Sequence, residues 1–146
     1  MPKISVLMSV NNGERYLEKS IESIIHQTFN DFEFIIINDG SHDDSLNIIK
    51  SYDDERIKLI NNKKQLGLTK SLNRGIELCK SEIIARMDAD DISKKDRFEK
   101  QYNYLLKNKD IAVLGGQVIL IDQNDNELKP NPRYPLSNQL IKWELF

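Results

Sequence analysis

Acidic side chains are crowded at the end of an apolar segment near the middle of the chain. Residues 83–87 are mostly apolar and lead directly into Asp88, Asp90 and Asp91, which we call the acidic cluster. Carboxylates this close repel one another unless a cation lies among them. A hard divalent metal fits, because it takes oxygen ligands and commonly bridges to substrate phosphates. The alternative is an acidic turn in which Asp91 or Ser93 caps the following helix. On this segment alone, both interpretations stand.

Two further polar turns follow apolar segments earlier in the chain. Residues 4–10 end at Asn11, and residues 32–37 end at Asn38 and Asp39. Asp39 taken alone fits an Asx turn or a helix cap. Its place directly after an apolar segment, like that of the acidic cluster, favours a shared site instead.

The segments that must position these turns alternate between strand and helix. Nearly continuous apolar runs are typical of strands covered on both faces, as in parallel sheets, and apolar residues at helical spacing indicate amphipathic helices. We predict strands over residues 4–10, 32–37, 57–60, 83–87 and 111–122, helices over 14–27, 43–49, 68–79, 95–106 and 137–146, and a hairpin turn at 122–126. This alternation predicts an α/β fold: a mostly parallel sheet with helices on both faces.

In such a fold, the loops that follow the strands lie along one edge of the sheet, where ligands bind. Asn11, Asp39 and the acidic cluster should therefore converge on one cleft. The sequence contains neither G-x-G-x-x-G nor G-x-x-x-x-G-K-[ST], which weakens the dinucleotide and P-loop interpretations. Carboxylates and phosphates repel each other because both are negatively charged. Bound Mg²⁺ or Mn²⁺ would therefore have to lie between them. Asp39 would need a neutral donor such as an imide N–H or a sugar hydroxyl, and a nucleoside diphosphate supplies all of these groups.

Composition excludes several classes of protein. The 146 residues fit one domain but are few for an enzyme that binds two substrates. A formal net charge of -2 gives no basic field for nucleic acid or an anionic membrane. The single cysteine, Cys79, excludes an internal disulfide and a thiolate-rich metal site. No apolar run is long enough to span a bilayer, and residues 1–3 do not begin a signal peptide, so we expect a soluble, cytoplasmic segment.

Five short stretches of the sequence, spread from residue 6 to residue 91, carry recognisable motifs. They are VLMSVNNGERYL at residues 6–17, SIIHQT at 23–28, FEFIIINDGS at 32–41, NRGI at 73–76 and MDADD at 87–91. Together they resemble the amino-terminal half of family 2 glycosyltransferases with a GT-A fold, and the resemblance covers residues 4 to about 120. It implies a Rossmann-like, nucleotide-sugar-binding fold. It also implies an inverting enzyme that moves a sugar from a nucleotide diphosphate sugar, most often a UDP-sugar, to an acceptor hydroxyl.

The resemblance further implies roles for individual residues. Ser9 and Asn11 match the turn that contacts the nucleotide base, and Asp39 matches the carboxylate that accepts from the base imide. In the D-x-D pair, Asp90 matches the residue that ligates Mn²⁺ or Mg²⁺ on the diphosphate, and Asp88 lies close to the ribose and the metal. The expected nucleotide-binding residues are Ser9, Asn11, Glu14, Asp39 and Asp88, and the expected metal ligands are Asp90 and Asp88.

Two positions depart from the family pattern. Asn11 stands where many members have tyrosine, so an aromatic surface against the base is expected to be missing. Asn38 stands where many members have a second aspartate. We expect Asn38 to keep a hydrogen-bonding role with one charge fewer.

The end of the chain bears on catalysis. In this family the general base and most acceptor-binding residues follow the point where this chain stops, so no catalytic residue is expected within it. We expect residues 1–122 to bind the donor and residues 123–146 to begin the acceptor side, without activity of their own. The acceptor of the full-length protein would be a glycan or lipid-linked glycan, met in the cytoplasm at the inner face of the membrane. Trp143 and Phe146 would lack core partners and promote self-association.

Other functions fit parts of the sequence. A noncatalytic nucleotide-binding or interaction domain would use the acidic turns only to cap helices. A nucleotidyltransferase would share the sheet edge and the metal but needs a glycine-rich basic loop, and residues 11–14 are neither glycine-rich nor basic. Arg74 is interpreted as part of a solvated helix face. Arg86 either pairs with a carboxylate of the cleft or lies on an exposed strand face.

Overall fold

The computed structural model describes residues 1–134 and 136, and it divides into a compact unit Met1–Lys107 and a second unit that begins at Asn108. The strands of the first unit are β1 (Ile4–Val10), β2 (Phe32–Asn38), β3 (Ile57–Asn61) and β4 (Ile84–Asp88), and its helices are α1 (Glu14–Ile25), α2 (Ser45–Lys50), α3 (Leu68–Ile76) and α4 (Arg97–Lys107). Each strand and helix expected before residue 108 is present, with ends close to those predicted. The prediction of an α/β fold is confirmed.

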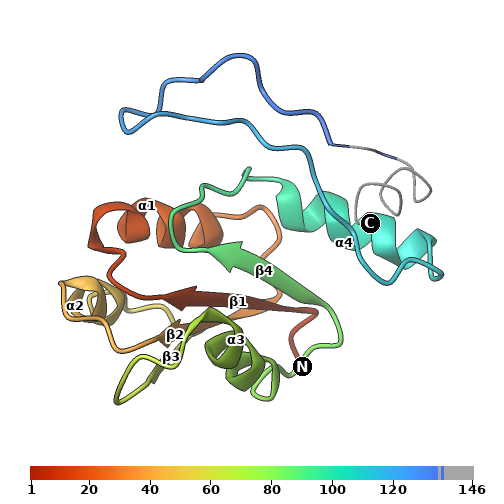
Figure 1. Ribbon diagram of the computed structural model, residues 1–146. Helices are drawn as coiled ribbons and strands as arrows, with labels where there is room; N and C mark the ends of the chain where they lie inside the picture. Colours follow the sequence, from red (N-terminus) through yellow and green to blue (C-terminus); the bar gives the residue numbers. More distant parts are fainter. Residues whose placement is uncertain (135, 137–146) are drawn as a thin grey trace. The chain divides into compact units, whose positions relative to one another are not determined.

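The strands form one parallel sheet in the order β3-β2-β1-β4 (Figure 1). β1 and β2 occupy the centre, and nearly all their residues are buried. This burial on both faces explains why their sequences are almost continuously apolar. Parallel strands need crossover connections, and the helices between them supply these.

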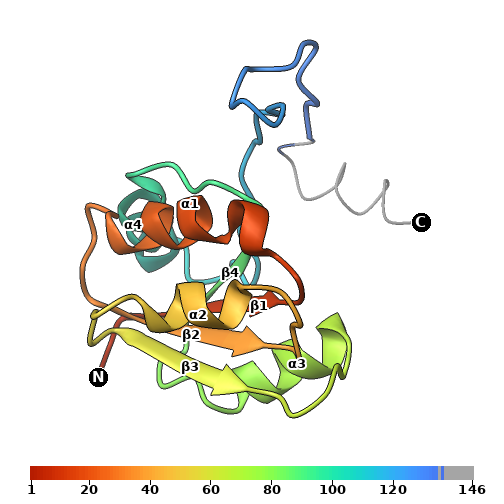
Figure 2. The ribbon, with the colours of Figure 1, turned by 90° about the vertical axis from the view of Figure 1, so that its left-hand side faces the viewer.

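Helices cover both faces of the sheet (Figure 2). On one face, alternate residues of β1 and β2 pack with α1, α2 and α4 in the larger core cluster. On the other face, Leu7, Ile35 and Ile37 pack against Leu72 of α3. Gly75 lets α3 come this close, because a Cβ there would lie 2.2 Å from Leu7 Cδ1. Burial of each such side chain contributes about 1.5–3 kcal/mol, so the central strands are held firmly in place.

The buried face of α4 is a narrow stripe. Phe98 is fully buried and Tyr102 packs against the core, but Leu106 is 43% exposed. Positions 98, 102 and 105 repeat at helical spacing, and position 106 lies at the edge of that stripe.

The second unit contains little regular structure among its described residues. Asp122 donates its amide to the Asn126 carbonyl (2.9 Å) and Ile121 forms an antiparallel bridge with Glu127, so the hairpin turn is confirmed. The continuous strand expected over residues 111–122 is wrong, since Ile121 is the only one of these twelve described residues that forms a bridge. The expected helix at 137–146, with Trp143 and Phe146, lies outside the described residues.

None of the helices in residues 1–134 and 136 has the length and apolar character needed to cross a membrane.

Candidate functional site

The carboxyl ends of β1, β2 and β4 lie together at one edge of the sheet. Val10 of β1 pairs with Asn38 of β2, and Ser9 of β1 pairs with Asp88 of β4. Asp39, the residue after β2, and Asp88 therefore flank β1, two strand spacings apart across the sheet and two residues apart along it, or roughly 12 Å. The predicted convergence of the polar turns on one edge is confirmed.

The strand order also locates a crevice at this edge. From β1 the sheet grows through β2 to β3, and the chain then returns to the opposite side of β1 to form β4. Ligands of open α/β sheets bind at such a switch point in the strand order. Because side chains alternate along a strand, Ser9 and its register partner Asp88 share the face that carries Leu7 and α3.

The Asp39 carboxylate is buried and holds the loop that precedes α3. Its Oδ1 accepts from the Leu66 amide (2.8 Å) and the Asn62 side-chain amide (2.8 Å), and its Oδ2 accepts from the Gly67 amide (2.8 Å). Burial raises the pKa of Asp39, but the hydrogen bonds from Leu66, Asn62, Ser71 and Gly67 outweigh burial and leave that pKa below its ordinary value. The carboxylate is therefore charged at neutral pH and already well solvated by the protein.

Asn62 links Asp39 to helix α3. Its side-chain amide also donates to Ser71 Oγ (3.0 Å), and its Oδ1 accepts from Arg74 Nη1. Asn62 is buried, and sequence reasoning missed it. The available signal was its place just after β3, at the same edge as Asp39. Arg74 lies at an exposed position of α3, as expected of a solvated helix face, and its guanidinium also contacts the amide that solvates Asp39.

Gly40 and Asn11 bring the first two turns against the same loop. Gly40 has φ 69°, and a Cβ there would lie 2.6 Å from the Gln65 amide nitrogen, so only glycine permits this approach. Asn11 donates through Nδ2 to the Asp39 carbonyl (2.8 Å) and accepts at Oδ1 from Gln65 Nε2 (3.1 Å). Asn11 thus lies at the junction of the turns after β1, β2 and β3.

The amino end of α1 is occupied by side chains of the turn after β2. The amides of Asn12, Gly13 and Glu14 donate to Ser41 Oγ (3.0 Å), Ser45 Oγ (2.9 Å) and Asp43 Oδ2 (3.0 Å), respectively. In return, the Glu14 carboxylate accepts from the Asp44 amide (2.9 Å). These helix donors are therefore engaged within the chain and do not form an open phosphate cradle, in agreement with the lack of a glycine-rich motif. Glu14, expected at the nucleotide, fastens the two turns together.

The acidic cluster forms a turn that is tied to α1. The Asp91 amide donates to the Asp88 carbonyl (3.3 Å), which closes the turn around Asp90. The Ser20 hydroxyl lies 3.0 Å from the Asp88 carbonyl and 2.5 Å from the Asp91 carbonyl. Helix α4 begins only at Arg97, so the interpretation of Asp91 or Ser93 as its cap is wrong.

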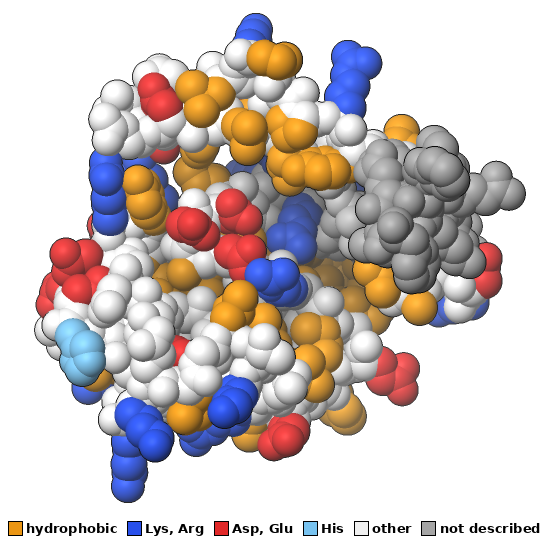
Figure 3. Space-filling view, viewed as in Figure 1, with side chains coloured by type: hydrophobic (Ala, Val, Ile, Leu, Met, Phe, Trp, Pro, Cys, Tyr) orange, Lys and Arg blue, Asp and Glu red, His pale blue; other side chains and the backbone are white. Residues whose placement is uncertain are grey.

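Like charges crowd this turn. Burial, followed by the charges of Asp88 and Asp90, raises the pKa of Asp91, although Arg97 and Arg86 act in the opposite direction. Arg86 Nη2 donates to Asp88 Oδ1 (2.7 Å), and both side chains are about half exposed. Arg86 therefore pairs with a carboxylate and also lies on an exposed strand face, which are the two alternatives that the sequence left open. Figure 3 shows acidic side chains gathered over the carboxyl end of β4 with basic side chains beside them.

The donor set fits a hard divalent cation that is shared with a ligand. Within the part of the chain that the structure describes, no group of three or more His, Cys, Asp or Glu side chains is placed to hold a metal by itself. Mg²⁺ and similar ions, however, are usually bound by one or two carboxylates together with substrate phosphates. Asp88 and Asp90, at this edge of the sheet and crowded with Asp91, match that pattern.

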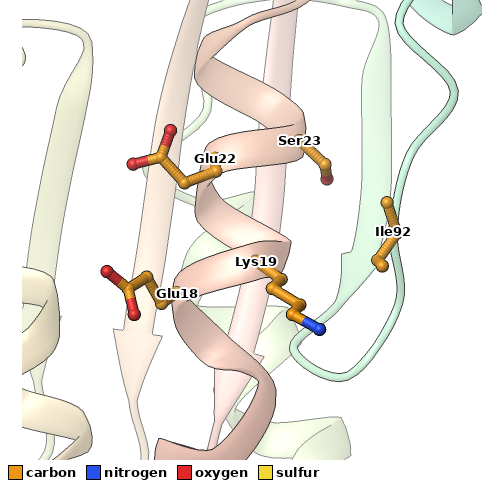
Figure 4. Close-up of a pocket in the computed structure, with 5 residues that line it drawn as sticks. All are labelled: Glu18, Lys19, Glu22, Ser23 and Ile92. Atoms are coloured by element: carbon orange, nitrogen blue, oxygen red, sulfur yellow. The ribbon is translucent and has the colours of Figure 1, made fainter. Parts of the chain in front are cut away.

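A separate hollow of about 540 Å³ lies beside α1 (Figure 4). Its lining consists of Glu18, Lys19, Glu22, Ser23 and Ile92. These residues come from α1 and from the segment after the acidic cluster, not from the strand ends. The lining combines both signs of charge without convergent donors, so the candidate site remains the edge formed by β1, β2 and β4.

Comparison with known proteins gives consistent matches. Residues 5–145 match the family model described as Glycosyl transferase family 2. The O-antigen biosynthesis glycosyltransferase WbnJ of Escherichia coli is 41% identical over 143 residues, which cover 95% of this chain and 55% of that protein. The chain spans about half the length of the curated relatives it matches.

Solved structures share the fold. S. aureus TarS 1-349 in complex with UDP-GlcNAc has a TM-score of 0.70 at 23% identity, covering 73% of this chain and 32% of that one. The mannosyltransferase PcManGT from Pyrobaculum calidifontis in complex with GDP-Man and Mn²⁺ has a TM-score of 0.56 at 19% identity, covering 62% of this chain and 28% of that one. The GT-A, Rossmann-like architecture expected from the sequence is thereby confirmed.

Proposed function

The chain belongs to glycosyl transferase family 2, and from this membership we propose that its sheet edge binds the nucleotide-sugar donor of a sugar transfer reaction. The observation that carries the proposal is the placement of Asp39 and Asp88 on either side of β1 at the switch point of the sheet. A charged acceptor and a crowded acidic turn roughly 12 Å apart match the two ends of a nucleoside diphosphate.

At the Asp39 end we propose that the nucleotide base is bound. The carboxylate is fixed and charged, and Oδ2, which accepts from the Gly67 amide, would take a base imide N–H as a further donor. Asn11 and Ser9 would face the base and ribose from β1. A UDP-sugar is the donor that we propose, and the fold shared with the UDP-GlcNAc complex of TarS supports this choice.

At the other end we propose that Asp90 and Asp88 hold Mn²⁺ or Mg²⁺ on the diphosphate. Such an ion, when bound, would neutralise charge on the departing diphosphate. The residues of this chain act by position: the turn presents the carboxylates, and Arg86 holds the Asp88 carboxylate in place through its hydrogen bond. The Mn²⁺ of the PcManGT complex, a protein of the same fold, agrees with this assignment.

The reaction that we propose for the whole protein is an inverting transfer. The acceptor hydroxyl oxygen would form a bond to the anomeric carbon while the bond from that carbon to the diphosphate breaks. Its proton would pass to a carboxylate general base. Residues 1–122 would serve the donor, and residues 123–146 would begin the acceptor side. The O-antigen relative supports a glycan or lipid-linked glycan as acceptor.

Calorimetric titration of the chain with UDP, with and without Mn²⁺, tests the proposal. We expect binding that Mn²⁺ strengthens, and we expect Asp90→Ala to remove that gain while the weaker metal-free binding of UDP persists. Glu99→Ala, which removes an exposed acid of α4, is the charge-matched control and should bind as the wild type does. Equal affinity of the wild type and an Asp88→Ala, Asp90→Ala double variant would contradict the proposal and favour a noncatalytic interaction domain.

A further inference from the structure

Helix α1 and the turn that follows it carry polar side chains that adjoin the segment from Asp88 to Phe98. Ser20 is completely buried, Gln27 is 3% exposed, and Ser23 lies between them at helical spacing. Polar groups in such surroundings are costly unless they are hydrogen-bonded. What they bond to therefore indicates why they are there.

All three side chains bond to the irregular segment that joins β4 to α4. Ser23 Oγ accepts from the Ser93 amide (3.0 Å), and Figure 4 shows Ser23 directed towards the stretch that carries Ile92. Gln27 donates to the Lys94 carbonyl (2.8 Å) and accepts from the amide of Phe98 (3.1 Å). Residues 89–96 belong to no helix or strand. Their backbone groups therefore take hydrogen-bond partners from α1 and the turn after it.

Ser20 differs from the other two residues in what it holds. Its hydroxyl is shared between the carbonyls of Asp88 and Asp91, the two residues that enclose Asp90. Ser23 in turn donates to the Ser20 carbonyl (2.7 Å), which ties the serines to each other. The crowded carboxylates of the acidic cluster tend to drive this turn open, and the contact from Ser20 opposes that tendency at both ends of the turn.

We propose that Ser20 is a positioning residue for the metal end of the donor site. By closing the turn before any ligand arrives, it holds the Asp88 and Asp90 carboxylates at the spacing that a shared cation requires. The inference rests on the proposed function, because it presumes that these carboxylates meet a metal diphosphate. It adds that their affinity for that ligand depends on a buried hydroxyl that never touches it.

The test separates the metal end of the site from the base end. Affinities of the chain for UDP with saturating Mn²⁺, for UDP with a chelator and for uridine are measured by calorimetry for the wild type and Ser20→Ala. The gain in UDP affinity that Mn²⁺ provides should fall roughly five- to tenfold in Ser20→Ala, about the value of one net hydrogen bond. Uridine affinity should stay within about twofold of the wild-type value, since the Asp39 end is untouched.

Ser5→Ala is the matched control. Ser5 is equally buried and also holds a turn, by accepting from the Ser81 amide (3.0 Å), but it lies at the opposite end of β1. Ser5→Ala should lower the melting temperature and leave the Mn²⁺ gain unchanged. If Ser20→Ala does not fold, Ser20→Cys keeps the volume with a weaker donor and should show the same loss in smaller degree.

The outcomes are distinct. A full Mn²⁺ gain in folded Ser20→Ala, or an equal loss in Ser5→Ala, overturns the positioning role and leaves the proposed function intact. A wild type without any Mn²⁺ gain overturns the metal assignment itself, and the positioning role with it.

Discussion

Replacement of Asp39 by asparagine tests whether this carboxylate organises the sheet edge before any ligand binds. In the structure it accepts from the amides of Leu66 and Gly67 and from the side chain of Asn62. An asparagine side chain at this position would keep one oxygen and point an NH₂ group at one of these donors. One charge-assisted bond, worth about 1.5–3 kcal/mol, would be lost and the others weakened to neutral strength. We expect Asp39→Asn to reduce the free energy of unfolding by about 2–4 kcal/mol.

The pH dependence gives the effect of Asp39→Asn a second signature. Because the folded state lowers the pKa of Asp39, its stabilising contribution is complete above the ordinary aspartate pKa of about 3.9 and is lost as the pH falls through the folded value. The stability difference between the wild type and the variant should therefore be largest at neutral pH. It should shrink as the solution is acidified below about pH 4.

Urea denaturation monitored by circular dichroism at pH 7 and at lower pH measures both effects. Asp31→Asn, which removes a half-exposed acid 3.7 Å from Lys3, is the control and should change stability by less than about 0.5 kcal/mol. If Asp39→Asn were as stable as Asp31→Asn at pH 7, or if its deficit did not change with acid, the account of the buried carboxylate would be refuted.

Two further predictions concern the loop that Asp39 holds. Gly40→Ala should cost more stability than Gly67→Ala by at least about 1 kcal/mol in urea denaturation, because both glycines have positive φ but only a Cβ at position 40 meets backbone at under 3 Å. An equal loss of stability in the two variants would show that the positive φ alone, and not the contact of the Cβ with backbone, sets the cost. Arg74→Ala should reduce the free energy of unfolding by about 0.5–1.5 kcal/mol, because it removes the bond to Asn62. Lys70→Ala, on the exposed face of the same helix, is the control and should leave stability unchanged. An unchanged stability of Arg74→Ala in the same assay would indicate a side chain that is only solvated.

The sequence predicts the central strands well, because a strand that is buried on both faces has an almost continuously apolar sequence. Residues 4–10 and 32–37 are apolar at almost every position, and they form the central strands. Once the strands are known to be parallel, topology alone brings Asn11, Asp39 and Asp88 to one edge. The same logic fails at residues 111–122, where apolar content is present but, among the described residues, pairing is confined to Ile121. A strand forms only by pairing with another strand, and the apolar pattern of one segment does not show which segment it pairs with.

The internal connections of the site leave almost no trace in the sequence. Ser20 and Asn62 are single polar residues without periodicity, and each matters through a backbone or side-chain group far away in the sequence. Arg74 occupies an exposed helix position, which is ordinarily solvated. These contacts follow from the detailed packing of α1 and α3 on the sheet, which pattern reasoning does not resolve.

Asn38 shows how an unexpected residue type fits the electrostatics of the site. It is buried beside Asp39, donates to Asn61 Oδ1 (2.6 Å) and accepts from the Ser41 amide (3.3 Å), so the predicted hydrogen-bonding role is confirmed. An aspartate here would face the Asn61 oxygen without a proton to donate, unless that amide turned over. It would also place a second charge directly next to a carboxylate whose hydrogen-bond donors are already committed. The amide keeps the edge of β2 ordered while Asp39 remains ionised, and an ionised Asp39 is the state that both the loop and the proposed base contact require.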